Sequence, residues 1–474
     1  MQLPKERRRW LLLPCLNKVR EFDGKLLFSA MAVESGWGVM LGYKGFVNLV
    51  ETPGAVIEMS FKSGNLDRHE RLGRKICAWD EEGLVFTSPH DYCRRRLLDS
   101  SIDRMEMGFL WGKNQQGVIR GCKKESKAKF HVTGNPRFDM LRPELREYYA
   151  PESERLIRQY GDFILVNSNF ATVNEYRGRA FTMGKLRVKQ VITTAEDEQN
   201  ELARERFEEA IMAAFIQAIP RLSSEFREFV IIVRPHPSED FEVWREKTAG
   251  LPNVRVVHQG DVIPWLMAAR AAIHNSCTTG IQSYLLGKPA VAYLPARSVE
   301  YDKDLPNSLS IHAESLDELM AAIKRLLAGS HAFDSPRLHE MEGIAAHHIE
   351  GLSGPWASQR VLDQLGNLEV EEETLKLSPS YVTGMDRRSA GGAMKLARLG
   401  ANILRRGMPV QKPDLESAPE VVEKEKYVRQ TFPKLDIGKV RADLARLAQI
   451  TGRFRKVSVF QTGDDHICLF PTEA

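Results

Sequence analysis

The amino-acid sequence predicts an α/β protein with two Rossmann-like, doubly wound domains that face each other across a cleft, followed by a C-terminal extension. Three observations support this fold class. The chain has 474 residues, more than one ordinary domain accommodates. Short apolar runs alternate with amphipathic helical patterns, which is typical of parallel sheets covered on both faces. This alternation starts twice, once near residue 10 and again near residue 163.

The first series occupies residues 10–135. The apolar run at 10–16 predicts a buried strand: Pro14 interrupts it and charged residues follow, so it is too short for a signal peptide or a membrane span. Apolar residues spaced by three and four predict a helix over 24–35. Further strands are expected at 39–43, 55–61, 75–79, 105–111 and 130–133. Residues 136–160 are charged and helical in pattern, which indicates a connection, and we assign the N-terminal domain to residues 1–158.

The second series opens with the apolar run Phe163-Ile164-Leu165-Val166. Residues 172–198 contain few apolar side chains and indicate a surface excursion or a lid. The remaining pattern predicts strands at 229–233, 254–258, 271–274 and 290–294, and helices at 201–219, 262–269 and 278–286. Such regular alternation is what a doubly wound domain leaves in a sequence, and we assign this domain to residues 159–365.

The extension, residues 366–474, differs in composition. It contains an acidic run at 369–373, a segment rich in Pro, Glu, Lys and Val at 407–424 that indicates a linker, and two strands of a small hairpin at 457–460 and 467–470. Residues 387–406 are basic and amphipathic in pattern, which favours a peripheral contact with an anionic membrane, although such stretches also pack on their own protein.

Composition limits the classes of function. Hydrophobic residues make up 43% of the chain and charged residues 27%, as in a globular protein with real cores. The formal net charge is only +4, so nothing demands a nucleic-acid partner. The six cysteines lack CxxC spacing, and we expect reduced, buried thiols in a cytoplasmic protein, with neither a disulfide framework nor a zinc site.

The sharpest local motif is Val233-Arg234-Pro235-His236-Pro237, which directly follows an apolar strand. Each proline forces the residue before it into an extended conformation, so His236 is held rigidly at the carboxyl end of the strand, where open α/β sheets bind ligands. There its imidazole can offer a phosphate oxygen a hydrogen bond or a full positive charge. The alternative is a rigid strand exit with an incidental histidine.

A second motif, residues 274–280, lies between a predicted strand and a helix. Ser276 is expected to cap this helix, with Thr278 and Thr279 in its first turn, where unpaired amides and the helix dipole favour a phosphate. Hydroxyl residues commonly cap helices without binding anything, so this motif is weak by itself. Two such loops leaving neighbouring strands of one domain make a stronger prediction.

The third motif is Trp79-Asp80-Glu81-Glu82-Gly83, at the end of a strand in the first domain. Crowded carboxylates raise one another's pKa, which suits a general base, and we expect Glu81, or second to it Glu82, in this role. An acidic, solvated turn is the alternative. Two further polar groups also occupy loop positions, Arg20 with Glu21, Asp23 and Lys25, and residues 134–139 with Arg137, and either could line a cleft or be an ordinary loop.

These motifs carry a family resemblance. The order His236-Pro237, then Ser276 with Thr278-Thr279, then Gly287-Lys288-Pro289 resembles the GT-B sugar transferases of capsule synthesis: polysialyltransferases, capsular Kdo transferases and the glycerophosphate polymerases of teichoic acid. Glu81-Glu82-Gly83 resembles the acidic motif of the polysialyltransferases. Across residues 10–365 the chain resembles the surface carbohydrate biosynthesis proteins, notably at 14–27, 134–139 and 166–170.

The resemblance implies a glycosyltransferase that takes a sugar from a CMP- or CDP-linked nucleotide donor and gives it to a glycan or lipid-linked acceptor, with no metal or other cofactor. Catalytic roles would fall to Glu81, Glu82 and His236. Donor-binding roles would fall to Arg234, Pro237, Asn275, Ser276, Thr278, Thr279 and Gln282. Acceptor-side roles would fall to Arg20, Glu21, Asp23 and Arg137. The alternatives are a nucleotide-sugar 2-epimerase of the same fold and a non-catalytic, glycan-binding scaffold.

Overall fold

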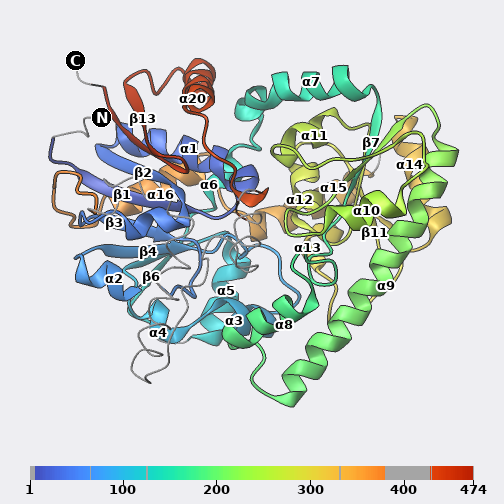
Figure 1. The fold of residues 1–474 in the computed structure, drawn as a ribbon, viewed down its shortest axis with the longest axis horizontal. Coiled ribbons are helices and arrows are strands. Elements are labelled where there is room, and N and C mark those ends of the chain that lie inside the picture. Colours follow the sequence, from blue (N-terminus) through green and yellow to red (C-terminus); the bar gives the residue numbers. More distant parts are fainter. Residues whose placement is uncertain are drawn as a thin grey trace, which may run out of the picture.

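The computed structural model describes residues 6–64, 66–123, 126–329, 333–378, 428 and 430–472. It contains two sheets, each flanked by helices, which lie beside one another (Figure 1). Strands within each sheet are mostly parallel and are connected through helices, so the α/β class and the two-domain GT-B architecture are confirmed.

The first sheet has the strand order β13-β14-β2-β1-β3-β4-β5-β6. Its central strand is buried on both faces, as a continuous apolar run requires. The strands are β1 (Arg9–Cys15), β2 (Trp37–Tyr43), β3 (Ala55–Glu58), β4 (Lys75–Trp79), β5 (Met107–Leu110), β6 (Lys129–Val132), β13 (Val457–Gly463) and β14 (His466–Pro471). The helices and turns between them are α1 (Lys18–Glu34), η1 (Lys44–Asn48), α2 (Leu66–Arg71), α3 (Pro89–Arg96), α4 (Asp99–Ile102) and α5 (Lys113–Cys122).

The second sheet has the order β12-β11-β10-β7-β8-β9, and all its recorded pairings are parallel. Counted from its own first strand this is the Rossmann order 3-2-1-4-5-6, which reverses between β7 and β10. The strands are β7 (Phe163–Asn167), β8 (Val230–Arg234), β9 (Val254–Val256), β10 (Ala271–His274), β11 (Ala290–Tyr293) and β12 (Ile311–Ala313). The helices are α8 (Arg179–Val188), α9 (Ala195–Glu225), α10 (Phe241–Lys247), α11 (Val262–Ala268), α12 (Thr278–Leu285), α13 (Asp304–Ser308) and α14 (Leu316–Leu327).

Helix α1 begins at Lys18, six residues before the predicted start, so the prediction that a helix begins at Gly24 is wrong. Gly24 lies inside the helix, at the point where α1 approaches α6 (Pro136–Asp139) closely enough to exclude a side chain. A Cβ on Gly24 would lie 2.6 Å from the Cα of Arg137, so only glycine permits this approach. The glycine therefore marks a packing contact of the helix and not its boundary.

Two segments join the sheets. The first runs through α6, η2 (Pro143–Tyr149) and α7 (Ala150–Tyr160); the second returns through α15 (Ser335–His348) and α16 (Ala357–Leu365) to pack on α1 and α6. The carboxylate of Asp139 accepts hydrogen bonds from the amides of Ala357 (2.7 Å) and Ser358 (2.8 Å) and so caps α16. Gly134, with φ +78°, lies so close to the returning chain that a Cβ would lie 2.1 Å from the carbonyl oxygen of Glu350.

The predicted lid, residues 172–198, contains α8 and contacts the first domain through α3. The guanidinium of Arg94 donates to the carbonyl oxygen of Val191 (3.0 Å) and forms an ion pair with Asp197 (2.8 Å). Asp197 also forms a reciprocal capping box with Thr194, which starts α9 at Ala195, earlier than predicted. The lid segment is thus tied to both domains.

The predicted C-terminal hairpin is confirmed, and it extends the first sheet. Strand β14 pairs antiparallel with β2, opposite residues 39–42, and β13 forms the new edge. Helix α20 (Ile437–Thr451), which was not predicted, contacts η2 and β13. The basic segment 387–406 and the linker 407–424 lie outside the described residues. Within the described ranges, no helix is both long and apolar enough to cross a bilayer.

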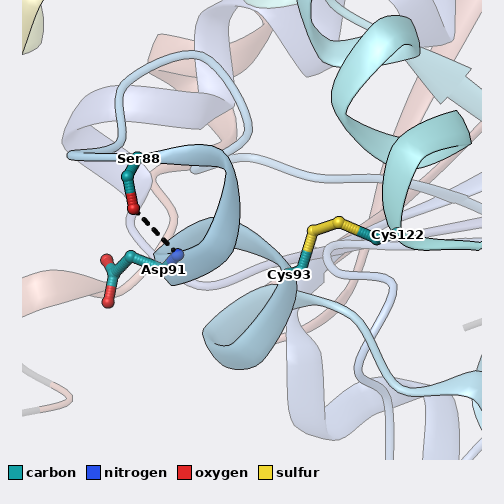
Figure 2. The surroundings of a disulfide bond; sticks show 4 residues. All are labelled: Ser88, Asp91, Cys93 and Cys122. Atoms are coloured by element: carbon teal, nitrogen blue, oxygen red, sulfur yellow. Dashed lines mark hydrogen bonds between the residues drawn. A yellow bond between two sulfur atoms is a disulfide. The ribbon is translucent and has the colours of Figure 1, made fainter.

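The expectation that all cysteines are reduced is wrong for one pair. Cys93 on α3 and Cys122 at the end of α5 form a disulfide, with their Cα atoms 6.3 Å apart (Figure 2). The other four cysteines are free and buried, as predicted. Because a disulfide requires only that two helices bring their side chains together, a sequence separation of 29 residues carries no signal of it. Ser88 caps α3 beside this link by accepting from the amide of Asp91 (3.1 Å).

Candidate functional site

The reversal of strand order in the second sheet brings two predicted loops together. Asn167, the last residue of β7, donates from Nδ2 to Oγ1 of Thr279 in the first turn of α12 (2.9 Å). Asn275, which follows β10, is directed to the carbonyl oxygen of Asn169 (3.4 Å). Among the described residues, Oδ1 of Asn167 and Oδ1 of Asn275 are buried without a hydrogen-bond partner. Ligands of doubly wound sheets bind at such a reversal, so these polar groups occupy the expected position.

His236, one residue beyond Pro235 at the end of β8, lies beside this reversal. The amide of Ser238 donates to its Nδ1 (3.2 Å), which leaves the ring proton on Nε2. Burial, with a smaller contribution from Arg20, lowers the pKa of His236 to about 4. At this pKa the imidazole is neutral near pH 7, so of the two expected roles, a hydrogen bond and a full positive charge, the surroundings favour the hydrogen bond. What remains is a single, oriented N–H donor.

Helix α12 begins at Thr278, as predicted, but its cap residue differs from the predicted one. Its cap is Cys277, and Ser276 precedes it with a left-handed backbone (φ 45°), so the prediction that Ser276 caps the helix is wrong. The reversed backbone at Ser276 turns the chain so that the next residue starts the helix. Thr278 and Thr279 lie in the first turn as predicted, where amides have no partner within the helix. The end of the helix therefore still offers donors to an anion.

The other predicted donor-side residues have distinct surroundings. Arg234 is buried and donates to the carbonyl oxygen of Gly260 (2.6 Å), and burial lowers its pKa to about 10 despite nearby Asp261. The carbonyl oxygen of Pro237 accepts from Nε2 of Gln430 (2.5 Å). Gln282 is buried on α12. The carbonyl oxygen of Arg234 also accepts from the amide of Ser168 (3.2 Å), which follows β7, so Arg234 and Pro237 support the loops.

In the first domain, the acidic turn after β4 divides its three carboxylates among three cations. Asp80 is fully buried and forms a bidentate pair with Arg96. Glu81 is buried and accepts from Nε1 of Trp79 (2.8 Å) and from Nζ of Lys25 (2.9 Å), while its Oε2 has no hydrogen-bond partner in the part of the chain that the structure describes. Glu82 pairs with Arg20 (2.5 Å), and its side chain is 48% exposed. Glu82 is thus the carboxylate that a substrate could reach.

Behind the turn, Lys25 lies between two carboxylates. Its ammonium contacts Glu21 (2.9 Å) as well as Glu81, and it donates to the carbonyl oxygen of Pro14 (2.8 Å). Burial would lower the pKa of Lys25, but the two carboxylates outweigh burial and raise it. Burial likewise opposes ionisation of Glu21, yet Lys25, Arg20 and two backbone amides hold its pKa below the ordinary value. The carboxylate of Glu21 is therefore occupied by Lys25 and by the backbone amides of Leu16 and Asn17.

The expectation that neighbouring carboxylates raise the pKa of the predicted base is wrong for Glu82. Burial acts in that direction, but Arg20, Arg96 and Arg137 together lower the pKa of Glu82 to about 2. The sequence-based expectation considered the adjacent acids alone, while the fold surrounds Glu82 with three arginines from distant segments.

The acidic turn (residues 79–83) and the loop after β8 that carries His236 (residues 235–240, the histidine loop) meet at the junction of the domains. Arg20 and Glu82, from the first domain, both act on the pKa of His236 in the second, Arg20 lowering it and Glu82 raising it. Glu82 also acts on the ammonium of Lys303, at the start of α13. The fold therefore brings Arg20, Glu82 and His236 together. Asp23 has other neighbours: burial, Asp261 and Asp443 raise its pKa, and Tyr149 donates to it.

Arg137 is buried beside this group. Its guanidinium lies over the rings of Trp111 (5.4 Å) and Phe138 (5.3 Å). Within the described part of the chain, its Nε and Nη1 have no hydrogen-bond partner, and burial lowers its pKa. Arg137 thus contributes positive charge to the junction without being neutralised by a direct ion pair in these ranges.

Two residues at the junction were not predicted. Lys303 lies in the loop between β11 and α13. It could have been found by considering the charged residues of every loop that follows a predicted strand. Glu239 is fully buried three residues after His236 and binds both loops. No local pattern distinguishes it from the other acids of this loop. No group of His, Cys, Asp or Glu in the described residues has the arrangement of a metal site.

No protein-family model matches the chain, and no curated protein matches it in sequence. Among solved structures, it is similar to a UDP-N-acetylglucosamine 2-epimerase (13% identity over 79% of this chain and 100% of that one, TM-score 0.48). It is also similar to the UDP-GlcNAc 2-epimerase from Neisseria meningitidis bound to UDP-GlcNAc (10%, 76% and 100%, TM-score 0.46). A third is the wall teichoic acid polymerase TagF (10%, 76% and 88%, TM-score 0.45). At this level of similarity the chemistry rests on the site's own residues.

Proposed function

We propose that this protein is a glycosyltransferase of surface polysaccharide biosynthesis that takes its sugar from a CMP- or CDP-linked donor. The observation that carries the proposal is the meeting of the two domains, where Arg20 and Glu82 lie within electrostatic reach of His236. This proximity supports a site in which His236 binds the donor phosphate, while Arg20 and Glu82 contact the acceptor. The motif resemblance supports the choice of nucleotide.

In the proposed reaction, the N–H of His236 and the first amides of α12 hold the donor phosphate at the strand reversal. Glu82 takes the proton of the acceptor hydroxyl, the hydroxyl oxygen bonds to the anomeric carbon, and the bond from that carbon to the phosphate oxygen breaks. The nucleotide leaves with the bonding electrons, and the same donors stabilise its new charge. Because the N–H of His236 and the amides of α12 are already oriented, these donors need to move little as the negative charge develops on the phosphate.

We propose Glu82 as the base in preference to Glu81, which the sequence favoured. Glu81 is buried and committed to Lys25 and Trp79. Glu82 is half-exposed and acts on the pKa of His236, and within the described residues it forms an ion pair with Arg20. A substrate anion that draws Arg20 away from Glu82 would raise the pKa of that carboxylate and make it a better base.

The donor site is tested by the thermal stability of the protein with CMP, CDP, UDP and GDP. CMP or CDP should raise the melting temperature most, and H236A should weaken this effect while leaving the fold intact. An unchanged affinity and activity in H236A would remove His236 from the site. A protein that binds none of the four nucleotides would support the scaffold alternative.

The base is tested with E82Q and E81Q, each compared at saturating donor. E82Q should bind donor normally and lose transfer by about a hundredfold, a typical contribution of a general base. Loss confined to E81Q would return the role to Glu81, and normal transfer in both would make the turn structural. Incubation with donor alone separates the 2-epimerase alternative, which releases an epimer or a free sugar without any acceptor.

The acceptor and the membrane contact are also proposals. A glycan or lipid-linked acceptor is expected on the side of Arg20 and Arg137, and the basic segment 387–406 would hold the enzyme at an anionic membrane. Because β13 and β14 belong to the first sheet, the test deletes only residues 387–406 and leaves the C-terminus intact. The full chain should sediment with anionic liposomes at low salt, and the deletion variant should not.

A further inference from the structure

The carboxylate of Glu239 is the most heavily hydrogen-bonded group near the histidine loop. It is fully buried. Its Oε1 accepts from Oγ of Ser168 (2.8 Å) and from the amides of Phe170 (3.1 Å) and His236 (2.9 Å). Its Oε2 accepts from Nε1 of Trp244 (2.8 Å) and Nδ2 of Asn174 (3.4 Å). Five donors thus converge on one side chain.

These donors come from three segments. Ser168, Phe170 and Asn174 belong to the loop after β7, His236 to the loop after β8, and Trp244 to α10. The two loops also pair through their backbones, since the amide of Asp240 donates to the carbonyl oxygen of Asn174 (2.9 Å) and that of Tyr176 to Ser238 (3.0 Å). Glu239 therefore links the loop after β7 to the loop after β8, and loss of its carboxylate would weaken the contact between them.

The hydrogen-bond pattern favours a carboxylate anion. Four of the five partners are N–H groups that can only donate, and the Ser168 hydroxyl donates as well, so the ionised carboxylate satisfies all five. Burial raises the pKa of Glu239, and these hydrogen bonds oppose that effect. Glutamine at this position could keep one oxygen for the three donors on the Oε1 side. Its amide group would then oppose the N–H groups of Trp244 and Asn174, which places donors against donors inside the protein.

Glu239 also closes the turn that carries the histidine. Its amide donates to the carbonyl oxygen of His236 (2.9 Å), while its carboxylate accepts from the amide of the same residue. Within this closed turn the amide of Ser238 reaches Nδ1 of His236 and selects the tautomer with the proton on Nε2. The orientation of the proposed phosphate donor therefore depends on the turn being closed.

We propose that Glu239 is a positioning residue: its ionised carboxylate holds the loops after β7 and β8 together and so fixes the orientation and tautomer of His236. This inference rests on the proposed function for its consequence, since only a phosphate donor at His236 makes the orientation matter for transfer. Its structural content, the control of the His236 ring, is independent of the reaction.

The first experiment observes the ring directly by ¹⁵N NMR of histidine-labelled protein without any nucleotide. In the wild type, Nδ1 of His236 should be the unprotonated nitrogen, and H236Q assigns the signal. E239Q should shift the signal towards a mixture of tautomers. A His236 signal that is identical in E239Q and the wild type would overturn the proposal.

The second experiment measures CMP and CDP affinity and donor turnover. E239Q should weaken binding or turnover by about tenfold or more, as displacement of a binding group does. The matched control is W244F, which removes a donor to Oε2 from the same buried carboxylate and leaves the three donors on Oε1. W244F should lower the melting temperature at least as much as E239Q while retaining affinity and the His236 signal. Equal losses of affinity in both variants would make Glu239 merely structural.

Failure of the proposed function and failure of the role of Glu239 give different results. If the wild type binds no nucleotide, the proposed function fails, and the NMR comparison still decides whether Glu239 controls His236. If E239Q does not fold, S168A replaces it in the nucleotide-free NMR experiment, because it removes one donor to Oε1 and leaves the charge. S168A should shift the His236 signal in the same direction, and an unchanged signal would overturn the proposal.

Discussion

The two domains meet with polar groups held in different ways. On the side of the first sheet, charges are held in ion pairs: Lys25 lies between Glu21 and Glu81, and Arg20 contacts Glu82. On the side of the second sheet, three buried histidines, His236, His258 and His274, are neutral near pH 7. Burial is the main cause that lowers the pKa of His236 to about 4 and those of His258 and His274 to about 3.

This difference separates two tasks. Ion pairs can exchange partners when a charged substrate arrives, so the first domain suits proton transfer and acceptor binding. Neutral donors fixed by hydrogen bonds have no counter-ion to give up, so the second domain suits the binding of a phosphate that enters and leaves as an anion. Substitutions in the ion pairs of the first domain should therefore affect proton transfer and acceptor binding, and substitutions among the neutral donors of the second domain should affect phosphate binding.

The largest effect is expected from breaking the ion-pair side with K25M. This substitution leaves Glu21 and Glu81 buried without their shared cation, and it should cost about 3–5 kcal/mol in the free energy of unfolding. Urea unfolding measures it. R104M is the control, because Arg104 pairs with Asp67 and Glu70 at the surface, and it should change little. A K25M cost no larger than that of the control would mean that the buried carboxylates do not need Lys25.

A second test loosens the same side through the disulfide. Cys93 lies on α3, whose Arg96 holds Asp80 of the acidic turn. Closing a loop of this length contributes about 3.5 kcal/mol in the chain-entropy model, so C93S/C122S should be destabilised by about that amount in urea. A reductant should lower the wild type to the level of the variant and leave the variant unchanged. Two free thiols at these positions in the untreated protein would contradict the expectation.

The positions of most strands along the chain could be predicted because most of them leave an apolar run. The bounds of β4 and β10 agree with the predicted 75–79 and 271–274. Neither the pairing of β14 with β2 nor the link between Cys93 and Cys122 could be predicted, because both depend on which distant segments meet. Local pattern determines an element, and tertiary packing determines its neighbours.

The same limit applies to the site. His236 and the turn at 79–83 were recognisable because prolines and adjacent acids stand out in a sequence. Their charge states were not, since the pKa of Glu82 is set by Arg20, Arg96 and Arg137 from other segments, and that of His236 mainly by burial. Glu239 was missed because its five donors come from three separate segments.

A third prediction concerns the neutral side and pH. Because the pKa of His236 is lowered from 6.5 to about 4, its contribution to stability is present above pH 6.5 and is lost as the pH falls towards 4. The difference in the free energy of unfolding between the wild type and H236Q should therefore change through this window and be constant from pH 7 to pH 8. Urea unfolding at each pH measures it. Parallel curves from pH 8 to pH 4 would mean that His236 titrates normally.

The smallest effect is expected at Ser276, whose left-handed backbone precedes α12 (φ 45°). Such a backbone is unfavourable for a residue with a Cβ, while glycine adopts it freely but loses more entropy on folding, so S276G should stabilise the protein by at most about 1 kcal/mol. Gln190 has the same backbone class (φ 54°) outside the proposed donor site, and Q190G is the matched control. Both variants should gain similar stability in urea, and only S276G should weaken CMP or CDP binding. If S276G is instead destabilised relative to Q190G, the serine hydroxyl supports the loop. A gain in stability with full nucleotide affinity would exclude the hydroxyl from the donor site and leave the amides of α12 and His236 to hold the phosphate.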